Sequence, residues 1–153
     1  MFSSRQPLRL TWTAVMDHTR RDRAIAPSAW QTRCVRAGEV HEFLNVGPGP
    51  DYPVDHVEYY GFAAFDTSGV LAVGDELVCD GRALGAISGF DETHMPNHYN
   101  ILVEGPRLAN GHALGLSAGT PVTTRPREDT RPPRDTPPRE DTRPREDQGS
   151  GGI

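Results

Sequence analysis

Short runs of alternating or continuous apolar residues, separated by turn-forming residues, occupy the first 124 positions of the chain. Residues 8–16 alternate cleanly, which predicts a half-buried β-strand. The face expected to be buried consists of Leu8, Leu10, Trp12, Ala14 and Met16. Further strands are expected over residues 28–36, 40–46, 56–65, 70–73, 76–79, 83–90, 99–104 and 114–124. No helical apolar spacing extends beyond two turns, so a helix is expected only as a short element around residues 17–26.

Glycine and aspartate mark the turns between these strands. Asp80-Gly81 is a two-residue hairpin signal, and Gly61 inside an apolar run predicts a bulge or a close backbone approach. Residues 71–77 and 116–122 share the pattern Leu-x-x-Gly-polar-x-aliphatic, which describes a turn leading into a strand. Many short strands with this internal repeat predict an all-β domain, a small closed or partly closed antiparallel β-barrel in which closure removes exposed strand edges.

The C-terminal residues differ in kind from the rest. From Arg125 a six-residue repeat of Arg, Pro, Glu, Asp and Thr is read four times and ends at Gln148. The repeat contains no aliphatic or aromatic residue, so it has no apolar surface whose burial would offset the entropy lost on ordering. We therefore predict a β-barrel domain over residues 1–124 and a disordered tail over residues 125–153, which is either simply solvated or an interaction arm.

Charge is concentrated on the predicted domain. The tail contains seven Arg and seven acidic residues, so the net charge of −5 lies on residues 1–124. An acidic domain is poorly suited to binding a nucleic-acid backbone, and we predict no nucleic-acid partner. All sixteen basic residues are Arg. With the many Gly, Pro, Ala and Asp residues, the absence of Lys predicts a GC-rich genome such as that of an actinobacterium.

Nothing in the sequence indicates export or membrane insertion. The N-terminus lacks the apolar segment of a signal peptide, and no segment approaches the length needed to span a membrane. We expect a cytoplasmic protein with no membrane partner. In that compartment Cys34 and Cys79 are expected to be buried free thiols.

Side chains capable of acid–base chemistry gather in residues 89–103, between two predicted strands. His94 and His98 have ordinary pKa values near the working pH, and Asp91 can orient an imidazole. Tyr99 can hold a substrate carbonyl or a developing enolate. These four residues are the candidate catalytic residues. Structural roles compete with this interpretation, because Asp, Thr and Asn also form turns and His98 can be a satisfied core histidine.

A metal site is weakly indicated in the same stretch. His94 and His98 are four residues apart, a spacing that places both on one face of a helix in zinc sites, but Pro96 between them argues against a helix. His41 with Glu42 can complete such a site only if another strand brings them there. We predict no metal. The chain also lacks a phosphate-binding glycine motif and a nucleophile elbow, so no cofactor is expected.

Several motifs resemble known families. Residues 61–124, together with residues 34–42 (Cys-Val-Arg-Ala-Gly-Glu-Val-His-Glu), resemble an uncharacterised family of small actinobacterial proteins; Gly89-Phe90-Asp91 and residues 96–101 (Pro-Asn-His-Tyr-Asn-Ile) carry the strongest likeness. More distantly, the strand order and the closing Leu-x-x-Gly-x-x-Val resemble the glucitol/sorbitol-specific IIA component of the sugar phosphotransferase system, a small β-barrel phosphorylated on a histidine. The comparable residues 60–66 contain no histidine. This resemblance, over most of residues 8–124, therefore implies the fold and not phosphoryl transfer.

Two functions are compatible with these features. In the first, the protein is a cofactor-independent cyclase, isomerase or lyase of bacterial specialised metabolism, and its barrel encloses an apolar small-molecule substrate. The residues expected to bind that substrate are Trp12, Trp30, His41, Phe43, Tyr59, Tyr60, Asn97 and Asn100. In the second, the barrel is a non-catalytic binding or adaptor module. A ligand-sized cavity reached by His94, His98 and Tyr99 favours the first, a packed interior favours the second, and an exposed apolar edge indicates a homodimer.

Overall fold

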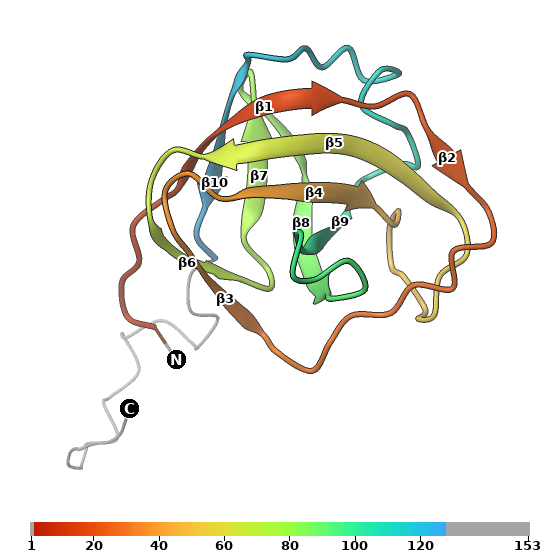
Figure 1. Ribbon diagram of the computed structural model, residues 1–153, viewed down its shortest axis with the longest axis horizontal. Helices are drawn as coiled ribbons and strands as arrows, with labels where there is room; N and C mark the ends of the chain where they lie inside the picture. The colour runs from red at the N-terminus through yellow and green to blue at the C-terminus, as the bar shows by residue number, and fades with distance from the viewer. Residues whose placement is uncertain (1, 128–153) are drawn as a thin grey trace, which may run out of the picture. The chain divides into compact units, whose positions relative to one another are not determined.

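The structure, a computed structural model, describes residues 2–127, of which Gln6–Arg127 form one compact unit (Figure 1). Its strands are β1 (Arg9–Val15), β2 (Thr19–Arg20), β3 (Thr32–Val35), β4 (Val40–Asn45), β5 (Val57–Phe65), β6 (Gly69–Ala72), β7 (Glu76–Cys79), β8 (Arg82–Asp91), β9 (Asn100–Glu104) and β10 (Pro121–Arg125). The described part of the chain contains no helix, so none there is long and apolar enough to cross a membrane. Most of the predicted tail, residues 128–153, lies outside the described residues.

Seven strands hydrogen-bond into a closed ring in the order β1, β10, β7, β8, β9, β4, β5 and back to β1 (Figure 1). The closed all-β fold predicted from the sequence is thereby confirmed. β2 adds to the edge of β5, while β3 and β6 form a separate two-stranded sheet. One pairing departs from the antiparallel expectation, because β4 and β9 run parallel, with Glu42 opposite Asn100.

The first strand follows its predicted alternation only in part. Leu10 and Trp12 point into the ring and are each 1 % exposed, as expected. A bulge between Trp12 and Ala14 then shifts the pairing with β5, and Ala14 is exposed. Val15 packs against the ring interior, whereas Met16 packs against a second apolar cluster. The expectation that Ala14 and Met16 share a face with Trp12 is wrong, because one extra residue in a strand reverses the side-chain alternation.

The bulge predicted at Gly61 is present in β5. Gly61 pairs with Phe43, and the next pair along is Tyr59 with Leu44, so Tyr60 is the extra residue. Gly61 has a φ of +143°, and an added Cβ would collide with the carbonyl oxygen of Ala14. Only glycine fits there, because the position combines a left-handed backbone with a close approach of β1.

The internal repeat forms two equivalent turns. Gly74 and Gly119 have φ values of +97° and +90°. In each turn the amide after the glycine donates to the carbonyl three residues earlier: Asp75 to Ala72 at 3.1 Å and Thr120 to Ser117 at 3.2 Å. The first turn leads into β7 and the second into β10, and these strands pair with each other. The predicted Asp80-Gly81 hairpin turn joins β7 to β8, with both φ values positive.

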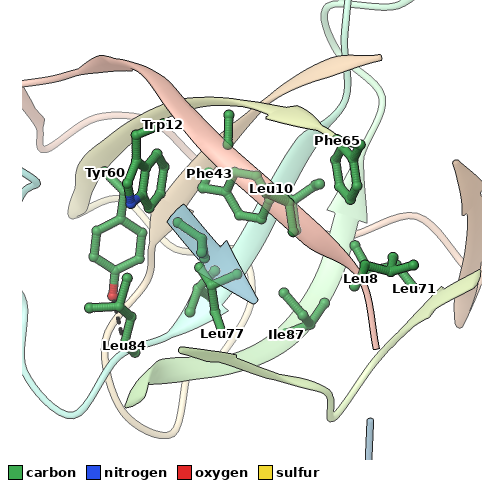
Figure 2. Packing of buried hydrophobic residues seen from close by; sticks show 14 of the residues in the cluster. Leu8, Leu10, Trp12, Phe43, Tyr60, Phe65, Leu71, Leu77, Leu84 and Ile87 are labelled. Atoms are coloured by element: carbon green, nitrogen blue, oxygen red, sulfur yellow. Dashed lines mark hydrogen bonds between the residues drawn. The ribbon is translucent and has the colours of Figure 1, made fainter. Parts of the chain in front are cut away.

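Two hydrophobic clusters lie on opposite faces of the sheet. The ring interior is filled by the main core (Figure 2), whose largest members include Trp12, Tyr60, Phe43, Phe65 and Phe90. The second cluster lies on the outer face and contains Ile25, Leu44, Val46, Val57, Tyr59 and Leu102. It is covered by residues 17–30, which we call the strap. Burial on both faces explains why β5 and β9 are rich in consecutive apolar residues, whereas β4 buries the polar side chains His41, Glu42 and Asn45 beside Phe43 and Leu44.

The strap was expected to contain a short helix, and that expectation is wrong. It contains β2 and an isolated bridge between Ile25 and Val54. Its apolar residues are too sparse to bury a helical face, and Ile25 is inserted between the strap and the sheet instead. Further along, Pro27 lies so close to Gly89 that a Cβ there would collide with it, and the Ser28 amide donates to the Phe90 carbonyl at 2.7 Å.

Candidate functional site

The predicted catalytic stretch is divided between the two faces of the sheet. Tyr99 belongs to the main core, on the side of the ring interior. Asp91 and Asn100 lie on the opposite, outer face, where Leu102 joins the second cluster. The division follows from the alternation of side chains along a strand. Tyr99 therefore does not converge with Asp91 and His98 on one point.

On the outer face, three polar side chains from three neighbouring strands form a row, the polar row: Glu42 of β4, Asn100 of β9 and Asp91 of β8. The parallel register places Glu42 opposite Asn100, and the antiparallel register places Asn100 opposite Asp91. The Asn100 Nδ2 donates to Asp91 Oδ2 at 2.8 Å. All three side chains are buried. Buried polar groups need partners, so the contacts of this row decide its role.

Asp91 has a complete set of partners. The Thr93 hydroxyl donates to its Oδ1 at 2.8 Å, and the Thr93 amide donates to its Oδ2 at 3.3 Å. From the strap, the Arg23 guanidinium lies 3.7 Å from Oδ2. These contacts fit the turn-forming role that the sequence left open for Asp91. They hold the carboxylate in place between Asn100 and Arg23.

His98 is bonded at only one ring nitrogen. Its Nδ1 accepts from Asn97 Nδ2 at 2.9 Å, so the neutral imidazole carries its proton on Nε2. That Nε2 is 3.4 Å from Glu42 Oε1, and among residues 2–127 neither it nor the buried Asn100 Oδ1 has a hydrogen-bond partner. The ring also contacts Phe62 edge-on, with centroids 5.1 Å apart. Burial lowers the pKa of His98, and the neighbouring Asn100 side chain opposes that lowering.

The pKa of Glu42 is shifted in the opposite direction from the pKa of His98. Burial raises the pKa of its carboxyl, and the positive charges of His94, Arg23 and His18 oppose that rise. A carboxyl with a raised pKa beside an imidazole with a lowered pKa brings the two proton affinities closer together. A pair of this kind can pass a proton in either direction, which is a requirement of a general acid–base pair.

His41, one residue before Glu42, faces the ring interior and is fully bonded. Its Nδ1 accepts from the Tyr99 amide at 3.0 Å, and its Nε2 donates to Glu39 Oε1 at 2.7 Å. Its ring packs edge-on against Phe65 and Tyr99. Burial lowers the pKa of His41, and the Glu39 carboxylate raises it. Both nitrogens are occupied, so His41 ties β4 to β9.

A cavity of about 250 Å³ lies where the strap and β3 pass the ends of β8 and β9. We call it the end cavity. It is lined by Ser28, Trp30, Thr32, Arg33, Cys34, Phe90, Glu92 and Tyr99. Trp30 is 70 % exposed, which is unusual for a large aromatic side chain. Aromatic walls with a few polar groups are typical of small-molecule sites.

The model of a family of unknown function (DUF6917) matches residues 2–125. The chain belongs to this family. The expected membership of an uncharacterised family is thereby confirmed. No curated protein and no solved structure matches the chain. The role of this DUF6917 protein has to be argued from its site.

The remaining residues predicted to bind substrate lie in several places of the DUF6917 structure. Trp12, Phe43 and Tyr60 are packed in the main core (Figure 2), where the Tyr60 hydroxyl donates to the Leu84 carbonyl and burial raises the pKa of Tyr60. Tyr59 belongs to the second cluster on the outer face. Trp30 lines the end cavity.

The exposed part of the predicted stretch lies beside the polar row. His94 and Asn97 are exposed. The His94 ring lies 5.2 Å from the His98 ring, measured between centroids. His94 and His98 therefore meet, whereas His41 contacts Tyr99 on the other face of the sheet.

The two cysteines differ in their surroundings. Cys79 is buried and free as expected, but the expectation that Cys34 is buried is wrong, because Cys34 is an exposed residue of β3 in the lining of the end cavity. Among residues 2–127, no group of three or more His, Cys, Asp and Glu side chains is arranged to hold a metal ion.

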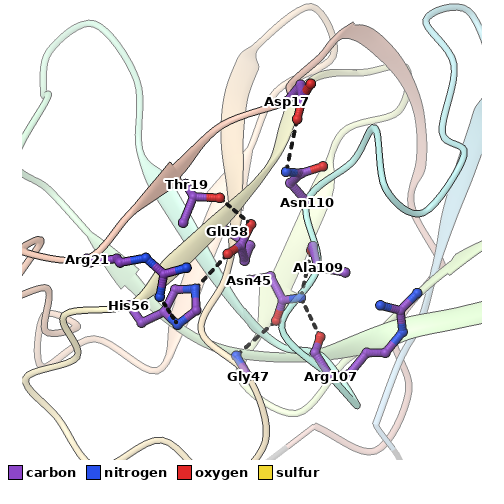
Figure 3. A network of polar contacts seen from close by, with 10 residues as sticks. All are labelled: Asp17, Thr19, Arg21, Asn45, Gly47, His56, Glu58, Arg107, Ala109 and Asn110. Carbon is purple, nitrogen blue, oxygen red and sulfur yellow. Dashed lines mark hydrogen bonds and ion pairs between the residues drawn. The ribbon is translucent and has the colours of Figure 1, made fainter.

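Asn45 is a buried polar residue that no pattern in the sequence distinguishes (Figure 3). Its Nδ2 donates to the carbonyls of Arg107 and Ala109 at 2.8 and 3.0 Å, and its Oδ1 accepts from the amides of Gly47 and Gly105 at 2.9 and 3.1 Å. With two donor and two acceptor contacts, the amide is saturated. Asn45 therefore anchors the loop after β9 to the end of β4.

Sequence reasoning also missed groups at both sites. Glu42 was considered only as a companion of His41, because a parallel β4–β9 pairing has no local signal. Arg23 lies in a polar connection, and Ser28 and Arg33 lie in the weakly alternating run 28–36, so no pattern distinguishes these residues from solvated polar groups. The one usable signal was Trp30, a large aromatic residue in a polar segment.

Proposed function

We propose that this protein binds a small, largely apolar organic molecule in the end cavity. The observation that carries the proposal is the exposed Trp30 indole at the rim of a cavity whose walls include Phe90 and Tyr99. A ligand that covers the indole removes apolar surface from water, which favours binding. The volume of about 250 Å³ is just below the roughly 300–1,000 Å³ of typical ligand pockets, so the ligand is small.

The proposal is tested by screening small aromatic and aliphatic compounds against the full chain by thermal shift, followed by NMR of the Trp30 indole N–H. Bound compounds are expected to move the Trp30 signal and to lose affinity in Trp30→Ala. The matched control is Leu108→Ala, which removes an exposed apolar side chain outside the cavity lining. Compounds that bind wild type and Trp30→Ala equally well would contradict the proposal.

The second candidate function is acid–base catalysis, as in a cofactor-independent cyclase, isomerase or lyase. The specific observation in its favour is the buried pair of His98 and Glu42, whose pKa values are shifted toward each other. His98 would remove or return a proton, with Glu42 as its partner and His94 beside it. The pair lies on the outer face, so its substrate reaches it from beside the strap.

This candidate is tested by hydrogen exchange. Compounds with acidic C–H groups are incubated with the protein in D₂O, and deuterium incorporation is followed by NMR. Exchange that is catalysed by wild type and lost in both His98→Gln and Glu42→Gln supports proton transfer by the pair. Exchange that persists in both variants would assign it to other groups. His112→Gln, a change of an exposed histidine outside the polar row, is the control.

The proposal also covers the organism and the cell compartment in which the protein acts. The composition without Lys supports an actinobacterial origin, and the proposal assigns the protein a cytoplasmic role in specialised metabolism. The alternative is a non-catalytic binding or adaptor module. The resemblance to the glucitol/sorbitol-specific IIA component and the filled ring interior support it. An acidic domain favours neither nucleic acid nor an anionic membrane surface as partner.

A further inference from the structure

Within residues 2–127, two polar groups in the lining of the end cavity have no hydrogen-bond partner. They are the Ser28 Oγ and the Arg33 Nε, and both atoms are buried. A buried donor without a partner destabilises the folded state, and a charged donor does so more strongly than a neutral one. Such groups need an explanation, and a ligand that displaces the side chains covering these two atoms would supply one, since both residues line the cavity.

Arg33 is held in position without using its hydrogen-bonding capacity. Its Cζ lies 3.7 Å from the centroid of the Tyr99 ring, so the guanidinium stacks on the aromatic face. Within residues 2–127, no carboxylate lies within ion-pair distance of it. Tyr99 is itself fixed, because its amide is bonded to His41. The cation is therefore preorganised for an acceptor that this part of the chain does not provide.

The side chains that line the end cavity indicate which kind of anion would pair with Arg33. The cavity contains one guanidinium and one carboxylate, that of Glu92. A phosphate dianion would be repelled by Glu92 and would find only one cation, whereas a carboxylate carries a single charge and matches the planar fork of Arg. The aromatic residues Trp30, Phe90 and Tyr99 favour a flat apolar body beside that charge.

We propose that the end cavity binds a small aromatic or unsaturated carboxylic acid, whose carboxylate accepts hydrogen bonds from Arg33 and Ser28 while its flat body lies against Trp30. This inference rests on the proposed function and specifies the ligand of that site. It assigns Arg33 and Ser28 as binding residues that set specificity, and it leaves the outer His98–Glu42 pair outside the binding event.

The test compares matched acids and amides on the full chain by isothermal titration calorimetry: benzoate with benzamide, cinnamate with cinnamamide, and indole-3-acetate with indole-3-acetamide. Phenyl phosphate is the dianionic probe. In wild type, the acid of at least one pair is expected to bind about tenfold more tightly than its amide, because its hydrogen bonds are charge-assisted. Phenyl phosphate is expected to bind more weakly than that acid.

The variants separate the binding residues from their neighbours. Arg33→Met is expected to abolish the preference for the acid, and Ser28→Ala to reduce it. Arg36→Met removes an exposed arginine three residues away and outside the lining, so the preference should be unchanged. Arg33→Lys keeps the charge without the planar fork and is expected to keep only part of the preference. Arg33→Lys also tests the role of Arg33 if Arg33→Met does not fold.

Each remaining outcome contradicts a defined part of the proposal. Acids and amides that bind equally well, with the Trp30 signal shifted, would refute the carboxylate inference and leave the proposed binding site standing. A preference for acids that survives in Arg33→Met and Arg33→Lys would refute the role of Arg33. A tighter complex with phenyl phosphate would replace the carboxylate with a phosphate. If neither member of any pair binds or moves the Trp30 signal, both the inference and the proposed function are refuted.

Discussion

His41 in β4 and His98 in the loop before β9 lie on opposite faces of the sheet, and they differ in how completely they are bonded. His41 uses both ring nitrogens, one to the Tyr99 amide and one to Glu39. His98 uses one nitrogen, and the other faces Glu42 at 3.4 Å without a hydrogen bond. Burial lowers the pKa of both rings. The pKa alone therefore does not separate a structural histidine from one that can exchange a proton, whereas the count of bonded nitrogens does.

The largest expected effect on stability comes from a substitution at Gly61, in the bulge that determines which side chains of β5 point into the ring. In Gly61→Ala the added Cβ collides with the Ala14 carbonyl oxygen, and alanine is strained at a φ of +143°. We expect a loss of about 4 kcal/mol or more in the free energy of unfolding, measured by urea denaturation. Gly38→Ala is the matched control, since Gly38 has a φ of +98° but no atom near an added Cβ. It should cost only about 1 kcal/mol.

Truncating the two histidines tests the comparison directly. His41→Ala leaves the Tyr99 amide and Glu39 without their partner and opens space beside Phe65. It should cost about 3 kcal/mol. His98→Ala removes a ring that makes one hydrogen bond and should cost about 1 kcal/mol. His94→Ala, at an exposed position, should be neutral in the same denaturation experiment. Equal losses at His41 and His98 would show that the two histidines are equally structural.

The pH dependence of stability should differ in sign between Glu42 and His98. The folded-state pKa of Glu42 is raised above 4.5, so its contribution to stability is fully present below 4.5 and is lost as the pH rises through the folded-state pKa. Wild type should therefore gain stability relative to Glu42→Gln between neutral pH and about pH 5, as measured by urea denaturation at both values. Glu92→Gln, an exposed carboxylate, is the control and should show no comparable gain.

For His98 the folded-state pKa is lowered below 6.5, so its contribution is present above 6.5 and is lost as the pH falls through the folded-state pKa. Below pH 6.5, wild type should lose stability relative to His98→Gln. If the free energies of unfolding of wild type, Glu42→Gln and His98→Gln changed equally with pH, neither group of the pair would have a perturbed pKa.

The smallest effect on stability is expected at Trp30. Because its side chain is 70 % exposed, Trp30→Ala should change the free energy of unfolding by less than about 0.5 kcal/mol. The same change should remove binding at the end cavity, so stability and ligand affinity separate at this residue. A large loss of stability in thermal or urea unfolding would instead make Trp30 part of the fold.

Much of the fold could be predicted from the sequence, because local patterns determine local structure. Alternation located β1 up to Trp12, the repeated Leu-x-x-Gly turns were recognisable, and Gly61 marked its bulge. Pairing between distant strands carries no such pattern. The parallel contact of β4 with β9 was therefore missed, and with it the meeting of Glu42 and His98.

The candidate site could also be predicted in part, where its residues are close together in the sequence. Asp91, His98 and Asn100 were placed in one polar stretch, and they do lie close together on the outer face. Tyr99 was grouped with them because it is adjacent in sequence, although alternation places it on the other face. Arg33 becomes notable only through its stacking on Tyr99, a contact between residues 66 positions apart that no spacing rule identifies.

The position of β10 between β1 and β7 determines when the fold can be completed. The amide of Leu8 donates to the hydroxyl of Thr124 at 2.9 Å, across 116 positions of the chain, and the amide of Thr124 donates back to the Leu8 carbonyl. Until the last strand arrives, β1 lacks one neighbour and β7 presents an open edge to other chains. Contacts between such distant residues slow folding, typically to the range of about milliseconds to seconds. The ring can therefore close only after β10 has been made, and a chain that stops before β10 is a candidate for aggregation rather than a smaller working protein.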